Sequence, residues 1–285
     1  MRRFHLLLFT VVLAGIVVAM VGARGLGRPP RAAHSSFGRG SVIALIHGLG
    51  SRPEHWLGTA RLLARRHHVV LVDLPGHGLS EMPHPFSLDR AVDAMEQALD
   101  DETSEPVILV GHSVGGLIAT RMALDHPERV RGLVLVETAL APQFTGRDRE
   151  ALLVALDHDY RGLLRTAYTA FGRDSAQGLE LYREVAALDS SAMKRWIRLA
   201  LTADLSQAAA GLRVPVLAIL AERSWPMGEP WPVTAEALGY ARVPNLKPMR
   251  IKDCGHFVML DRPAEVAQAI ARFAAANAGE PVAGR

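Results

Sequence analysis

The chain of 285 residues contains a single cysteine, Cys254. One cysteine excludes an intrachain disulfide and a zinc cluster built on several thiolates. Histidine is more frequent, with 12 residues, but no His-Glu-x-x-His or comparable ligand spacing occurs. We therefore expect no metal ion and no organic cofactor.

The sequence also lacks a concentration of charge of one sign. The formal net charge is only +3, and the arginines that produce it are spread along the chain. Nucleic-acid binding usually requires a basic patch or stripe, so no nucleic-acid partner is expected. Internal repeats and low-complexity tracts are absent as well. Because 49% of the residues are hydrophobic, the chain is predicted to form one α/β domain with an inserted subdomain.

A hydrophobic run long enough to enter a membrane stands at the beginning of the chain. Arg2 and Arg3 precede an apolar stretch over residues 4–21, which is long for a signal-peptide core and about the minimum for a spanning helix. Residues 1–24 are predicted to be a signal peptide or a membrane anchor, so we expect export or membrane attachment. Arginines flank the stretch on both sides and leave the side of the membrane open.

Apolar runs and helical patterns alternate through the rest of the chain. Residues 25–40, rich in Gly, Pro and Arg, are predicted to be a linker, and residues 278–285 a tail. Continuous apolar strands separated by helices indicate a parallel sheet covered on both faces. From 138 to 210 only helical segments occur, which predicts a helical lid between two parts of the core, 41–137 and 211–277. The predicted strands are 41–46, 68–72, 106–110, 130–136, 214–220 and 246–251.

The most informative motif is Gly111-His-Ser-Val-Gly-Gly116, which lies between a predicted strand and a predicted helix. Glycines two residues before and after Ser113, at Gly111 and Gly115, permit a turn too tight for side chains, so the serine hydroxyl is exposed. A bare Gly-x-Ser-x-Gly also occurs in loops that only turn the chain. Here strand, turn and helix stand in the required order, which makes Ser113 the candidate nucleophile.

Together with three other blocks, this motif resembles the α/β-hydrolase superfamily over about residues 41–276. The resemblance implies the α/β-hydrolase fold, a mostly parallel sheet with helices on both faces and an inserted helical lid. It also implies a catalytic triad in the chain order serine, acid, histidine. The other blocks are His47-Gly-Leu-Gly50, Asp73-Leu-Pro-Gly-His-Gly-Leu-Ser80 and Cys254-Gly-His-Phe-Val-Met-Leu-Asp-Arg-Pro263.

The resemblance assigns further roles by position. His256, after the last strand, matches the general base that a neutral serine needs. The backbone N–H groups of Leu49 and Val114 match the oxyanion hole. Gly48 and Gly50 let their loop approach the substrate closely, whereas His47 is interpreted as a structural hydrogen-bonding residue.

The sequence departs from the family pattern at the acid. An aspartate usually follows the strand 214–220, but Ser224 stands at that place. Some members carry the acid after the strand that follows the nucleophile helix, and here that position is Glu137. A carboxylate at the end of a core strand is costly to bury without a partner, so Glu137 is the predicted acid. Glu222 is the alternative, and Asp253 is interpreted as a turn residue.

These residues predict a serine hydrolase that cleaves a carboxylic ester, or a related acyl bond, of a small apolar substrate through an acyl-enzyme. A serine nucleophile argues against dehalogenase and epoxide hydrolase chemistry, which uses a carboxylate in this superfamily. A carbon–carbon bond hydrolase, thioesterase, amidase or peroxidase-like activity shares the same constellation and stays open. A ligand-binding protein with slow or no turnover is the alternative from another class.

Overall fold

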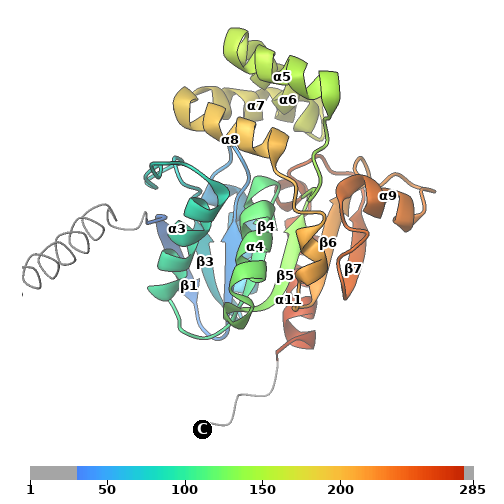
Figure 1. Ribbon diagram of the computed structural model, residues 1–285. Helices are drawn as coiled ribbons and strands as arrows, with labels where there is room; N and C mark the ends of the chain where they lie inside the picture. The colour runs from blue at the N-terminus through green and yellow to red at the C-terminus, as the bar shows by residue number, and fades with distance from the viewer. Residues whose placement is uncertain (1–30, 279–285) are drawn as a thin grey trace, which may run out of the picture.

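The computed structural model describes residues 31–278 and has a seven-stranded sheet at its centre (Figure 1). The strand order is β1-β3-β2-β4-β5-β6-β7, in which β1 pairs with β3 antiparallel and all other pairs are parallel. All the strands predicted from the sequence are present, with ends shifted by at most two residues. The strands are β1 (His34–Gly38), β2 (Val42–Ile46), β3 (His68–Val72), β4 (Val107–His112), β5 (Val130–Val136), β6 (Val216–Ala221) and β7 (Leu246–Ile251).

Helices cover both faces of this sheet, because apolar side chains of the strands point alternately to one face and to the other. In β2, Ile43 and Leu45 are buried on the side of α2 and α11, whereas Ala44 and Ile46 are buried on the side of α3 and α4. Successive side chains of a strand point to opposite faces, so a sheet covered on both sides requires continuous apolar runs. The helices packed on the sheet are α2 (Leu57–Leu63), α3 (Leu88–Asp100), α4 (Val114–Asp125), α9 (Trp231–Leu238), α10 (Val258–Asp261) and α11 (Pro263–Ala276).

Four further helices are inserted between β5 and β6, and we call them the inserted helices. They lie beyond the carboxyl ends of the parallel strands (Figure 1). The fully buried Trp196 anchors them there, because its Nε1 donates to the carbonyl oxygen of Pro75 at 2.8 Å. The inserted helices are α5 (Gly146–His158), α6 (Tyr160–Phe171), α7 (Ser175–Ala186) and α8 (Ser190–Thr202).

The prediction of a linker over residues 25–40 is wrong for residues 34–38, which form β1. This strand pairs along its whole length with β3 at the edge of the sheet. Its residues, His-Ser-Ser-Phe-Gly, are only partly buried, so the strand lacks the apolar run that is typical of β2 to β6.

The predicted signal peptide or anchor, residues 1–24, lies outside the described residues. Between residues 31 and 278, no helix is long and apolar enough to span a membrane. Export or membrane attachment through residues 4–21 therefore stays a prediction from the sequence.

A polar cluster joins β1 and β3 to the chain that follows α3. Glu102 accepts from Nε2 of His68 at 2.7 Å, and its other oxygen lies 3.2 Å from Nε2 of His34. The hydrogen bond to Glu102 raises the pKa of His68. Burial raises the pKa of Glu102, but hydrogen bonds from His68 and Ser36 outweigh it and bring that pKa below its ordinary value.

This cluster predicts a pH-dependent stability. The contribution of His68 is complete below its ordinary pKa of 6.5 and is lost as the pH rises through its raised pKa. The contribution of Glu102 is complete above 4.5 and is lost as the pH falls through its lowered pKa. Glu102→Gln should therefore reduce the free energy of unfolding more at about pH 6 than at about pH 8.5, measured by urea denaturation. Exposed Glu105→Gln is the control, and equal losses at both pH values for Glu102→Gln would contradict the prediction.

Candidate active site

Ser113 stands at the turn between β4 and α4 in a conformation that non-glycine residues rarely adopt. Its φ is 52° and its ψ is −120°. A backbone hydrogen bond to β5 holds the turn, since the Ser113 N–H donates to the carbonyl oxygen of Val136 at 2.9 Å. A Cβ atom at Gly111 would lie 2.4 Å from the Gly115 carbonyl oxygen, and one at Gly115 would lie 2.4 Å from that of His47. Both glycines are therefore required by close packing.

His256 and Glu137 meet beside this turn. His256 follows β7, and Glu137 follows β5 directly. The Nδ1 atom of His256 lies 3.1 Å from Oε2 of Glu137, and the two side chains are 15% and 1% exposed. A carboxylate accepts only, so Nδ1 carries the proton and the lone pair of Nε2 is available. His256 and Ser113 line the same cavity.

The buried carboxylate of Glu137 has two further donors. Its Oε1 accepts from the Ala221 N–H at 2.6 Å, and its Oε2 accepts from the Ser224 hydroxyl at 2.9 Å. These bonds offset the cost of removing a carboxylate from water. Ser224 is the residue that replaces the usual aspartate, so the structure gives it a role that the sequence did not indicate.

The other two carboxylates considered from the sequence do not reach His256. The backbone N–H of Glu222 bonds to the carbonyl oxygen of Ile251, but its carboxylate has no hydrogen bond to His256 within residues 31–278. The side chain of Asp253 is 81% exposed and pairs with Arg262 at 3.2 Å. Among the three candidates, the structure brings only Glu137 to the histidine.

The loop that carries His256 is held from both sides. The His256 N–H donates to the carbonyl oxygen of Phe171 at 2.8 Å, and the two rings are stacked with their centres 4.6 Å apart. On the other side, Nε2 of His112 donates to the His256 carbonyl oxygen at 3.0 Å. Burial, together with the neighbouring His256, holds the pKa of His112 well below its ordinary value, so His112 is a neutral donor. The sequence motifs indicated neither contact.

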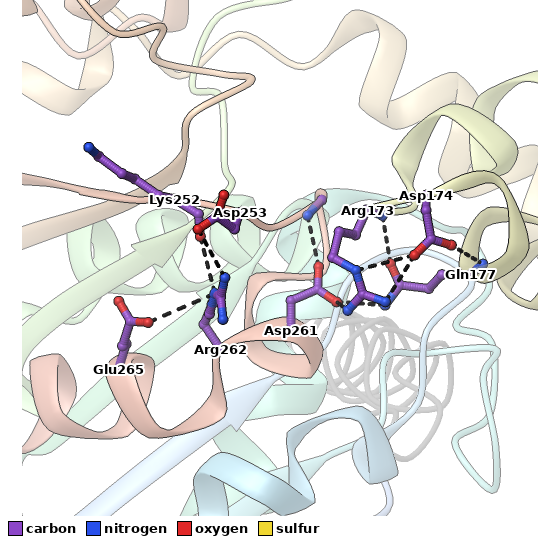
Figure 2. A network of polar contacts seen from close by, with 9 residues as sticks. Arg173, Asp174, Gln177, Lys252, Asp253, Asp261, Arg262 and Glu265 are labelled. Carbon is purple, nitrogen blue, oxygen red and sulfur yellow. Dashed lines mark hydrogen bonds and ion pairs between the residues drawn. The ribbon is translucent and has the colours of Figure 1, made fainter.

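Asp261 ties the same loop to the inserted helices, as Figure 2 shows. Its side chain is 1% exposed. One carboxylate oxygen accepts from the Gly255 N–H at 2.8 Å, and the other accepts from Arg173 at 3.1 Å and from Gln177 at 2.7 Å. The residue before His256 is thereby fixed to the beginning of α7.

The loop predicted to form the oxyanion hole is tied down by two buried histidines. The Gly50 N–H donates to Nε2 of His77 at 3.0 Å, and burial lowers the pKa of His77 to about 3, which keeps it a neutral acceptor. Nε2 of His47 accepts from the Leu74 N–H at 3.0 Å, and its Nδ1 donates to the Gly48 carbonyl oxygen at 2.8 Å. With both ring nitrogens bonded to the backbone, His47 has the geometry of a structural residue.

The backbone N–H groups of Leu49 and Val114, which the sequence assigns to the oxyanion hole, have no hydrogen-bond acceptor within the described part of the chain. The Leu49 carbonyl oxygen accepts from the Tyr168 hydroxyl at 2.6 Å, which fixes the Leu49 peptide against α6. A Cβ atom at Gly48 would lie 2.6 Å from Nδ1 of His112, so this loop also packs closely on the residue before Ser113.

Metal ligands and reactive thiols do not gather near the site. Between residues 31 and 278, no group of three His, Cys, Asp or Glu side chains is arranged to hold a metal ion. Burial, with a smaller contribution from Glu137, raises the pKa of Cys254 to about 12, so its thiol stays protonated at neutral pH.

Comparison with known proteins shows the family of the chain. A family model described as "Alpha/beta hydrolase family" matches residues 43–269, and the chain belongs to this family. Over 253 residues it is 27% identical to the pimeloyl-[acyl-carrier protein] methyl ester esterase of Aeromonas hydrophila, an alignment that covers 83% of this chain and 96% of that protein.

Two solved structures illustrate the shared fold. Est816, described as an N-acyl homoserine lactone degrading enzyme, has a TM-score of 0.75 and 21% identity over 87% of this chain and 98% of its own. A membrane phospholipase A described as a bacterial virulence factor has a TM-score of 0.67 and 22% identity over 98% of this chain and 100% of its own. At these identities the likeness concerns the fold.

The hydrogen bonds of Asp261 predict that its replacement by asparagine, a residue of nearly the same shape, lowers the free energy of unfolding. In Asp261→Asn, one carboxylate oxygen becomes an amide nitrogen, which must face either the Gly255 N–H or the donors of Arg173 and Gln177. A buried donor left unpaired costs about 1–3 kcal/mol, so the free energy of unfolding should fall by that amount in urea denaturation. Glu265→Gln, which removes an exposed carboxylate 3.9 Å from Arg262, should change it by less than about 0.5 kcal/mol. Similar small changes in both variants would contradict the prediction.

Proposed function

We propose that the protein is a serine esterase that hydrolyses carboxylic esters through an acyl-enzyme. The observation that carries the proposal is the 3.1 Å contact between His256 and the buried Glu137, formed beside the strained turn of Ser113. The relative from Aeromonas hydrophila, named as a methyl ester esterase, supports the same reaction class.

In this proposal the hydroxyl oxygen of Ser113 attacks the ester carbonyl carbon while Nε2 of His256 takes the hydroxyl proton. Glu137 stabilises the imidazolium that forms and keeps its Nδ1–H oriented. The negative charge on the carbonyl oxygen is stabilised by the N–H groups of Leu49 and Val114, which are fixed before the reaction begins. His256 then gives its proton to the departing alcohol oxygen. In the second half of the reaction, His256 takes a proton from the water molecule that attacks the acyl carbon. It then returns this proton to the Ser113 oxygen as the acid is released.

The inserted helices complete the proposed site as a lid. Phe171 stacks on His256, and Tyr168 holds the peptide of Leu49. Both residues belong to α6, so one helix contacts the proposed base and the proposed oxyanion loop. A lid fixed in this way covers one face of the imidazole and reduces its contact with water, which strengthens the interactions among charged groups there.

Covalent labelling tests the nucleophile. A fluorophosphonate probe should label the wild-type protein, because it requires an activated serine, and Ser113→Ala should abolish both labelling and ester hydrolysis. Labelling is measured by mass spectrometry of the intact protein and hydrolysis with p-nitrophenyl esters. Full turnover in Ser113→Ala would refute the assignment. A wild-type protein that is neither labelled nor active on any ester would support the alternative of a ligand-binding protein.

The acid is tested by a matched pair of substitutions. Glu137→Gln should lower kcat about a hundredfold or more, because the amide can present a donor to Nδ1 of His256 and favour the wrong tautomer. Glu222→Gln should leave kcat nearly unchanged, since its carboxylate does not bond to His256. The reverse order of effects would identify Glu222 as the acid.

The contact between Ser224 and Glu137 allows a rescue experiment, in which a second substitution restores activity lost by the first. The Ser224 hydroxyl lies 2.9 Å from the carboxylate oxygen that faces His256. A carboxylate at position 224 is therefore close enough to replace that of Glu137. We expect Glu137→Ser combined with Ser224→Asp to recover at least about tenfold in kcat over Glu137→Ser alone.

A further inference from the structure

Two adjoining cavities meet at Ser113 and His256, and their linings differ in polarity. The larger, of 540 Å³, lies under α5, α6 and α8. The smaller, of 360 Å³, lies between the chain after β5, the end of α8, the chain after β6 and the end of α9. Both volumes are in the range of small-molecule sites, about 300–1,000 Å³. A substrate whose reacting carbon lies at Ser113 can extend one arm into each cavity.

The larger cavity suits an apolar chain. Leu152 of α5, Leu163 and Ala167 of α6, and Ile197 of α8 line it. Among the described residues that line it, Arg223 is the only Arg, Lys, Asp or Glu, and it also lines the smaller cavity. A hydrocarbon chain placed here leaves water and packs on these apolar side chains.

The smaller cavity is lined by both a hydrogen-bond acceptor, on Gln143, and hydrogen-bond donors, on Arg223. Nε2 of Gln143 donates to the carbonyl oxygens of Ala141 and Ala237, at 3.0 and 3.2 Å, which fixes the amide and leaves its oxygen as an acceptor. Arg223 donates to the carbonyl oxygen of Ala170 through one nitrogen, NH1. A guanidinium has five N–H donors in all, so others remain for a ligand.

A hydroxyl group fits these partners better than a carboxylate does. It can donate to the oxygen of Gln143 and accept from Arg223, whereas a carboxylate accepts only. Glu137 is also among the residues around the smaller cavity, and its negative charge would repel a second one placed there.

We infer that the substrate is an ester of a medium-length apolar acid with a small alcohol that carries further hydroxyl groups, such as glycerol. This inference rests on the proposed esterase function. The acyl chain occupies the larger cavity and the alcohol the smaller one. The bond between the acyl carbon and the alcohol oxygen breaks, the alcohol leaves with the proton from His256, and water later supplies the hydroxyl group of the acid.

The test compares kcat/KM for two matched ester series. Monoesters of glycerol and esters of n-propanol, which lacks the hydroxyl groups, are prepared from acetic, butyric, octanoic and dodecanoic acids. We expect kcat/KM to rise about fourfold for each added methylene until the larger cavity is filled. At equal acyl length, the glycerol ester should exceed the propyl ester about tenfold.

Variants assign each preference to its cavity. Ala167→Phe, in the larger cavity, should shift the best acyl chain to a shorter one and leave the ratio of glycerol to propyl ester unchanged. Gln143→Leu, at a residue that lines only the smaller cavity, should bring that ratio close to one and leave the acyl preference unchanged, and Arg223→Leu, at a residue that lines both cavities, should lower the ratio as well. Arg183→Leu is the matched control, because Arg183 is an exposed arginine of α7 that lines neither cavity.

Fluorophosphonate labelling separates failure of the inference from failure of the proposed function. A protein that is labelled and hydrolyses esters, but does not prefer glycerol esters or keeps its acyl preference in Ala167→Phe, overturns the inference and leaves the esterase function standing. A protein that is neither labelled nor active on any of the esters overturns both.

Discussion

The buried carboxylate of Glu137 is the constraint on which the arrangement of the site depends. It is 1% exposed, and it is compensated by three donors from two separate parts of the chain: Ala221 and Ser224 at the end of β6, and His256 after β7. A carboxylate buried with fewer donors would cost several kcal/mol. The ends of β5, β6 and β7 must therefore stay in register for the site to exist, and continuous parallel pairing of these strands maintains that register.

The inserted helices also help to hold the loops of the site in place. Their anchor points surround the site: Trp196 on the Pro75 peptide, Tyr168 on the Leu49 peptide, Phe171 on His256, and Gln177 on Asp261. Each contact joins a residue of the insertion to a loop at the carboxyl ends of the strands. A rearrangement of the insertion large enough to break these contacts would also release the loop that carries His256. Substrate selection and the geometry of the proposed triad are consequently coupled through the same helices.

Much of the fold could be predicted because its signals are local. The buried strands from β2 to β6 are mainly apolar runs, and Ser113 and His256 are marked by glycines and by their places after strands. Edge strand β1 could not be predicted, because its side chains are largely exposed and its pairing with β3 is a tertiary property. Glu137 was accessible to an energetic argument, since an unpartnered carboxylate at the end of a core strand is unfavourable.

The supporting contacts of the site carried no comparable signal. Asp261, His112 and Ser224 act on residues between 6 and 144 positions away in the sequence, through single hydrogen bonds. Nothing in the local pattern of an aspartate near the end of a short helix, or of a serine after a strand, distinguishes such a partner from a solvated residue. These contacts become visible only when the sheet brings the loops together.

The place of the acid follows from the order of the strands. β5 and β6 are parallel neighbours, so the residues that follow them emerge side by side at the same edge of the sheet. A carboxylate carried after either strand can therefore approach a histidine that follows β7. In this chain Glu137 takes the β5 position, with a φ of 47°, and Ser224 at the β6 position donates to it. Ser224 therefore has a structural role of its own: its hydroxyl donates to the same carboxylate oxygen that faces His256, and it helps to hold the proposed acid in place.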